Sequence, residues 1–199
     1  MTEQKVVGYI LTGGKNTRME GRTKFFLECE GESFGQRILS SLSVLEEIYL
    51  SVNDPASYAG LGIPVVTDEI PDIGPMGGIL SGLHALPGKA LLVTASDVPF
   101  LSRGMAEKLL LAYNEKQCLT LSCVQGRMQP LFGIYPPSAV KVIEQLVQEK
   151  NYRMRSLAER MPVQLVDMEA DCAININTPE EYDSWCRKGV KSRVGEHKL

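Results

Sequence analysis

The stretch that most constrains the fold is residues 6–27, VVGYILTGGKNTRMEGRTKFFL. Its apolar start, Val6 to Leu11, is short and rich in β-branched residues, which predicts a buried strand. The strand ends in Thr12-Gly13-Gly14, and two glycines directly after a strand let the backbone approach a ligand closely. Four cations follow, opposed by one glutamate: Lys15, Arg18, Arg22 and Lys24. Their positive charges repel one another unless an anion lies among them. The stretch therefore predicts a strand followed by a phosphate-binding loop.

Spacing excludes two common phosphate-binding loops. The P-loop pattern needs a glycine five residues before Gly14, where the chain has Tyr9, and Asn16 follows Lys15 where Ser or Thr is required. The dinucleotide pattern G-x-G-x-x-G also fails, because no glycine after Gly14 keeps that spacing. The loop must therefore hold phosphates by another design, or be a solvated basic loop without a ligand.

The segments L-T-G-G-K-N-T-R-M and G-R-T-K-F-F-L resemble the signature L-A-G-G-x-S-x-R-M-G-x-D-K of the molybdenum cofactor guanylyltransferases. The chain departs from it at Thr12, Glu20 and Thr23, which stand for Ala, Gly and Asp. Near the C-terminus, N-I-N-T-P-E (residues 175–180) resembles the family's N-V-N-T-P-E. The sugar-nucleotide and cytidylyl pyrophosphorylases are broader relatives with the same strand, glycine loop and lysine. The resemblance implies transfer of GMP from GTP to the terminal phosphate of molybdopterin, with release of pyrophosphate.

Strands alternate with helices along the chain, which predicts a mostly parallel sheet covered on both faces. After the first strand we expect strands at 48–52, 64–67 and 90–95, and an antiparallel hairpin formed by 118–124 and 129–135. Ser33 with Gln36, and Thr178 with Pro179, predict helix starts. The expected fold class is a single-domain, Rossmann-like, three-layer αβα sandwich with an antiparallel portion. Its domain spans 1–189, followed by a polar tail at 190–199.

Bulk composition narrows the function classes. A formal net charge of −3 argues against nucleic acid as the main partner, and no apolar run reaches the ~18 residues of a membrane span. The chain starts without a signal peptide, which favours a cytoplasmic protein. Five scattered cysteines without a C-x-x-C pair are expected to be reduced, and two histidines make a zinc site improbable.

Three polar residues each follow a predicted strand: Asn53, Asp68 and Asp97. The carboxyl ends of parallel strands form the ligand-binding edge of such a sheet, so these residues are expected to lie beside the glycine loop. Asp97, in Ser96-Asp97-Val98-Pro99, follows a buried strand and suits Mg²⁺, although a turn or helix-capping role is the alternative. The resemblance carries the metal-ligand role to Asp97.

The catalytic set is expected to be Lys24, Arg18 and Asp97. Fixed cations stabilise the charge that gathers on the α-phosphate and the departing pyrophosphate, and this is the role given to Lys24 and Arg18. The resemblance places the nucleotide on Leu11, Thr12, Gly13, Asn53, Asp68 and Asp97, with Gly14, Lys24 and Gly77 added. Amide side chains suit a pterin edge, so the acceptor is assigned to Gln129, Asn175 and Asn177.

The expected partners are GTP and molybdopterin as substrates, Mg²⁺ as cofactor, and other molybdenum cofactor biosynthesis or acceptor proteins. Neither nucleic acid nor a membrane is expected. Two alternatives remain open at this point. One is a cytidylyl- or sugar-phosphate nucleotidyltransferase of the same fold, and the other is a non-catalytic nucleotide-binding domain.

Overall fold

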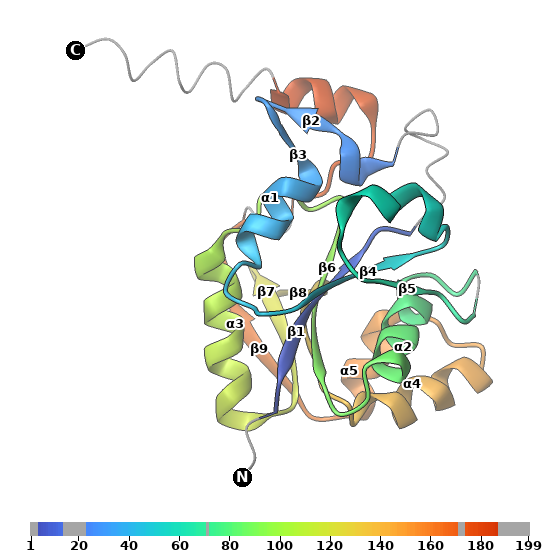
Figure 1. The fold of residues 1–199 in the computed structure, drawn as a ribbon. Coiled ribbons are helices and arrows are strands. Elements are labelled where there is room, and N and C mark those ends of the chain that lie inside the picture. The colour runs from blue at the N-terminus through green and yellow to red at the C-terminus, as the bar shows by residue number, and fades with distance from the viewer. Residues whose placement is uncertain (1–3, 14–22, 71, 171–173, 187–199) are drawn as a thin grey trace.

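The computed structural model describes residues 4–13, 23–70, 72–170 and 174–186. Within these residues it contains a seven-stranded sheet in the order β5-β4-β1-β6-β8-β7-β9 (Figure 1). The sheet strands are β1 (Val6–Leu11), β4 (Ile48–Val52), β5 (Val65–Thr67), β6 (Ala90–Ala95), β7 (Leu119–Val124), β8 (Arg127–Tyr135) and β9 (Val163–Asp167).

All neighbouring pairs in the sheet are parallel except the two that involve β8. The β7–β8 hairpin turns at Gln125 and Gly126, both with positive φ, as the tightest hairpin turns require. The expected antiparallel portion is thus confirmed. Between β7 and β8 the register shifts after Leu121, so that Ser122 pairs with Gln129 and residues 130–132 form a bulge.

Helices cover both faces of the sheet, which confirms the three-layer αβα arrangement (Figure 1). The helix α1 (Phe34–Ser41) and α3 (Arg103–Lys116) lie on one face. The other face carries α2 (Pro75–Ala85), α4 (Ala139–Gln148) and α5 (Met154–Arg160). Along the fully buried strand β6, Leu92 packs on the face covered by α1 and α3, and Leu91 and Val93 pack on the face covered by α2, α4 and α5. This alternation is the period of two that a strand buried on both faces requires.

The expected helix starts are present. Ser33 and Gln36 form a reciprocal capping box at α1, and Ser102 accepts a hydrogen bond from the Met105 amide at the start of α3. Thr178 accepts from the Glu181 amide at the start of the helical residues 179–186.

Between β1 and α1 the described chain forms three short elements: the 3-10 helix η2 (Lys24–Phe26) and the antiparallel pair β2 (Glu28–Cys29) and β3 (Glu32–Ser33). A second 3-10 helix, η3 (Pro55–Leu61), follows β4. Sequence periodicity predicted neither η3 nor α5, because both are short and lack a helical apolar stripe. None of the described helices is long and apolar enough to cross a membrane.

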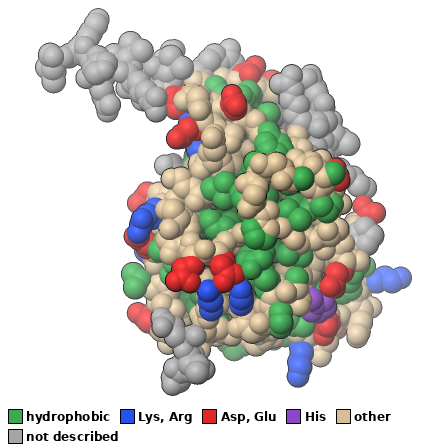
Figure 2. Space-filling model, in the orientation of Figure 1, with side chains coloured by type: hydrophobic (Ala, Val, Ile, Leu, Met, Phe, Trp, Pro, Cys, Tyr) green, Lys and Arg blue, Asp and Glu red, His purple; other side chains and the backbone are tan. Residues whose placement is uncertain are grey.

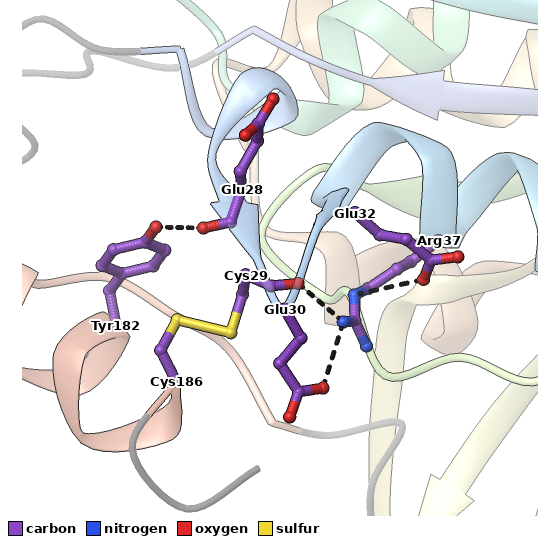
Figure 3. The surroundings of a disulfide bond; sticks show 7 residues. All are labelled: Glu28, Cys29, Glu30, Glu32, Arg37, Tyr182 and Cys186. Atoms are coloured by element: carbon purple, nitrogen blue, oxygen red, sulfur yellow. Dashed lines mark hydrogen bonds and ion pairs between the residues drawn. A yellow bond between two sulfur atoms is a disulfide. The ribbon is translucent and has the colours of Figure 1, made fainter. Parts of the chain in front are cut away.

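The C-terminal helical segment packs against the β2–β3 hairpin. Ile176 lies in a small apolar cluster with Leu27 and Phe34, and the Tyr182 hydroxyl donates to the Glu28 carbonyl (Figure 3). Figure 3 also shows a disulfide between Cys29 and Cys186, whose Cα atoms are 5.6 Å apart. The expectation that all cysteines are reduced was therefore wrong for this pair. Sequence spacing could not reveal the pair, because 157 residues separate the two positions.

Candidate functional site

A cleft of about 530 Å³ opens at the carboxyl ends of β1, β4, β5 and β6. Its size is typical of small-molecule sites. It gathers residues that the sequence assigned to the nucleotide and the metal: Leu11, Thr12, Gly13, Lys24, Asn53, Asp68 and Asp97. The ends of four parallel strands therefore meet at one cleft, as the rule for parallel sheets predicts, and Lys24 of η2 joins them.

Lys24 is positioned by the residue that follows it. Phe25 is buried and packs edge-on against Tyr58 of η3. On its other side it lies against Gly35 of α1, where a Cβ atom would come within 2.4 Å of the ring. Gly35 thus allows Phe25 to fill the space between α1 and η3, which fixes η2 at the rim of the cleft.

The Lys24 ammonium joins two segments that are far apart in sequence. Its Nζ donates to Asn177 Oδ1 at 2.9 Å and lies 3.4 Å from Asp97 Oδ2. The Ile176 amide donates to the Asp97 carbonyl at 2.9 Å, so the C-terminal segment is bonded directly to the turn after β6. A cation, a carboxylate and an amide oxygen therefore converge at one point.

The Asp97 carboxylate fits a hard cation. Its Oδ1 atom is buried and has no hydrogen-bond partner among the residues that the structure describes. A buried carboxylate oxygen is costly without a partner, and Mg²⁺ prefers oxygen ligands of this kind. In the same part of the chain, no group of three or more His, Cys, Asp or Glu side chains could hold a metal by itself. A magnesium ion here would take its other ligands from phosphates and water.

Asp68 lies on the opposite wall of the cleft. Its Oδ1 accepts a hydrogen bond of 2.8 Å from the Ser51 hydroxyl. Burial raises the pKa of the Asp68 carboxyl, and the bond from Ser51 opposes that rise. Asn53 lies beside Gly13, whose Cβ position would be 3.5 Å from the Asn53 side-chain amide.

Other expected residues lie differently. Gly77 does not line the cleft, because its Cβ position faces the Ile73 side chain at 2.8 Å; its neighbour Gly78 lines the cleft instead. Asn175 is exposed, and Gln129 donates weakly to the Arg127 carbonyl. Neither is among the cleft residues. Gly14 and Arg18 lie outside the described residues.

Sequence reasoning missed Ser51 and Leu131, which also line the cleft. Ser51 is a polar residue in an otherwise apolar buried strand, a signal that could have marked it. Leu131 lies in the bulge of β8, and no sequence pattern indicated that bulge.

The structure places His84 on the surface between two acids. Its ring nitrogens lie 2.9 Å from Glu69 and 3.2 Å from Glu144, so its imidazole connects α2 to α4. Hydrogen bonding to Glu69 is the main cause that raises the pKa of His84. On the face drawn in Figure 2, Lys and Arg side chains also stand next to Asp and Glu side chains.

Among known protein families, the MobA-like NTP transferase domain matches this chain, over residues 8–165. A probable molybdenum cofactor guanylyltransferase of Clostridium perfringens is 32% identical, over 90% of this chain and 95% of that protein. The molybdenum cofactor guanylyltransferase of Cereibacter sphaeroides is 34% identical, over 89% and 93%.

Solved structures show the same fold. The molybdopterin-guanine dinucleotide biosynthesis protein A of Archaeoglobus fulgidus superposes with a TM-score of 0.78 at 20% identity, covering 93% of this chain and 99% of that one. The 4-diphosphocytidyl-2C-methyl-D-erythritol synthase of Anaerococcus prevotii has a TM-score of 0.76 at 16% identity, covering 95% and 97%. At these identities the likeness extends to the fold alone.

Proposed function

Because the chain belongs to the MobA-like NTP transferase family, we propose that it is a molybdenum cofactor guanylyltransferase, which transfers GMP from GTP to molybdopterin. The observation that carries the proposal is the convergence of Lys24, Asp97 and Asp68 on one cleft next to the glycine turn. A cation and a metal-binding carboxylate at one end, and a purine-binding carboxylate at the other, match the two ends of a nucleoside triphosphate.

The reaction needs alignment more than acid–base catalysis. The terminal phosphate of molybdopterin attacks the α-phosphate of GTP in line, forming a new P–O bond, while the bond to the β-phosphate breaks and pyrophosphate leaves. A phosphate monoester is already anionic at neutral pH, so no side chain has to remove a proton from it. Catalysis therefore rests on positioning and on fixed charge.

Lys24 supplies that charge. Its ammonium lies at the rim of the cleft, where it can neutralise the negative charge that develops on the pyrophosphate. Asp97 would hold a Mg²⁺ ion, which when bound would supply charge neutralisation for the phosphates. In the free protein Asn177 and Asp97 hold the Lys24 ammonium in place.

The base-binding end favours guanine over cytosine. A carboxylate only accepts hydrogen bonds, and the Watson–Crick edge of guanine offers two adjacent donors, N1–H and N2–H₂. That edge of cytosine offers one donor group beside two acceptors. Asp68 at this wall of the cleft is therefore matched to GTP, which supports guanylyl over cytidylyl transfer.

The acceptor is assigned to residues outside the nucleotide cleft. Asn175 and Gln129 remain assigned to molybdopterin, beside the cleft and not in it. The proposal also includes a cytoplasmic location, because GTP is a cytoplasmic metabolite, and proteins of molybdenum cofactor biosynthesis as partners.

Pyrophosphate release tests the proposal. The full chain is incubated with molybdopterin and Mg²⁺ and with each of GTP, CTP, ATP and UTP in turn. We expect release with GTP that depends on molybdopterin. Release with CTP in preference to GTP would favour the cytidylyl alternative, and GTP binding without any pyrophosphate would favour a non-catalytic nucleotide-binding domain.

A further inference from the structure

A buried serine stands behind the base-binding carboxylate. Ser51 is the fourth residue of β4 and is 2% exposed, in a strand whose other inward side chains are apolar. Its hydroxyl donates to Asp68 Oδ1 at 2.8 Å. Its own carbonyl accepts from the Thr12 amide at 3.0 Å and from the Thr12 hydroxyl at 2.7 Å. One residue is thereby bonded to both walls of the cleft, the glycine turn after β1 and the carboxylate after β5.

The first turn of α2 confines the Ser51 hydroxyl. A Cβ atom at Gly78 would lie 2.7 Å from Ser51 Oγ and 3.3 Å from Asp68 Oδ1. The Tyr9 hydroxyl donates to the Gly78 carbonyl at 2.9 Å, which fixes that turn against the sheet. The serine therefore has little room for any other rotamer, and its hydrogen bond to Asp68 is held in place by packing.

We infer that Ser51 is a positioning residue that fixes the Asp68 carboxylate for recognition of guanine, an inference that rests on the proposed function. Each carboxylate oxygen has two lone pairs, so Oδ1 can accept from Ser51 and from one guanine donor at the same time. Oδ2 is then left for the second donor. A carboxylate without this support would rotate, and the paired acceptors would no longer face the N1–H and N2–H₂ groups together.

Replacement of the hydroxyl tests this role with little change in volume. In Ser51→Ala we expect the KM for GTP to rise about tenfold, as for loss of support to a charged hydrogen-bond acceptor, while kcat stays within about twofold. ITP lacks the 2-amino group of guanine, so the ratio of kcat/KM for GTP to that for ITP should fall in the same variant. A folding defect would lower kcat/KM for GTP and for ITP by the same factor, and it would leave their ratio unchanged.

The matched control is Ser41→Ala. Ser41 is also a buried serine, but its hydroxyl donates to the Ile38 carbonyl within α1. We expect Ser41→Ala to keep the wild-type preference for GTP over ITP.

A double-mutant cycle decides whether the serine acts through the carboxylate. If it does, Ser51→Ala should have no further effect on the GTP-to-ITP ratio in an Asp68→Asn background. An unchanged ratio in Ser51→Ala alone, or equal losses in both backgrounds, would overturn the inference. Failure of the proposed function looks different, because the wild-type protein would then show no GTP-dependent pyrophosphate release at all.

Discussion

The side chain whose position says most about the chemistry is Asn177. The family resemblance implied contact with the acceptor, yet the structure places its amide oxygen 2.9 Å from the Lys24 ammonium. The segment that carries it is bonded to the Asp97 carbonyl through the Ile176 amide. Asn177 can therefore orient Lys24, the lysine that we propose serves the triphosphate.

Asn177→Ala tests that orientation. Losing a hydrogen bond to a charged group should lower kcat about tenfold or more, because Lys24 acts in the chemical step, and should leave the KM for molybdopterin nearly unchanged. Steady-state kinetics with each substrate varied in turn measure both constants. Asn114→Ala, at an exposed position of α3, is the control and should match the wild type. A rise confined to the KM for molybdopterin would instead return Asn177 to the acceptor pocket.

At the level of single residues, the positions of much of the site were predictable. Asp68 and Asp97 were found because acids directly after strands lie at the ligand-binding edge of a parallel sheet. It was not predictable that Gly78, and not Gly77, lines the cleft. Adjacent helical residues point about 100° apart, and sequence alone does not set the rotation of a helix on a sheet. Ser51 was missed because its role depends on a partner 17 residues away.

Among the elements, α2 lies close against the sheet at the cleft. Gly78 makes that approach possible, since any Cβ there would lie 2.7 Å from Ser51 Oγ and 2.9 Å from the Leu11 side chain. Gly78 thus serves contact with the sheet at the expense of intrinsic helix stability.

Gly78→Ala should destabilise the protein. Alanine gains up to about 1 kcal/mol of helix propensity, but overpacking of this kind costs about 1–3 kcal/mol, and the displaced Asp68 should also raise the KM for GTP. Urea unfolding and GTP kinetics measure the two effects. The control is Gly104→Ala in α3, where an added Cβ would lie 3.9 Å from the Ser102 hydroxyl, an ordinary contact distance, so its stability should be unchanged or slightly higher. Equal stabilities for Gly78→Ala and the wild type would contradict the close approach.

Element order was also largely predictable, because strong apolar runs and caps coincide from β1 to α4. The exceptions include the short elements η3 and α5, and α5 lacks a helical apolar stripe. Its buried residues are only Ser156 and Leu157, too few to produce a helical period.

At the scale of the whole molecule, the β2–β3 hairpin and the C-terminal helix, which are far apart in sequence, lie against each other. The disulfide between Cys29 and Cys186 joins the β2–β3 hairpin to the C-terminal helix (Figure 3). In the chain, the hairpin follows Lys24 and the helix follows Asn177, and these two residues are themselves hydrogen-bonded. Stacking of Phe100 on Trp185 and the cation–π contact of Arg37 with Trp185 add non-covalent contacts to the same junction.

Reduction should weaken this junction without dismantling it. A disulfide that closes a long loop contributes about 2–4 kcal/mol, so a reductant should lower the Tm of the wild type by several degrees. Cys186→Ser should show the lower Tm with or without reductant. Thermal unfolding followed by circular dichroism measures both, and an identical wild-type Tm in the two conditions would show that the pair does not stabilise the fold.

The central claim is that Asp97 and Lys24 act on one bound GTP, and transfer of a label tests it most directly. GTP labelled at the α-phosphate is incubated with molybdopterin, Mg²⁺ and either the wild type or Asp97→Ala, and the labelled products are separated. We predict that the wild type moves the label into a guanine dinucleotide, and that Asp97→Ala, with an unchanged circular dichroism spectrum, does so at least about 10²-fold more slowly. Label transfer by Asp97→Ala at a near-normal rate, or label that never leaves GTP with the wild type, would contradict the account.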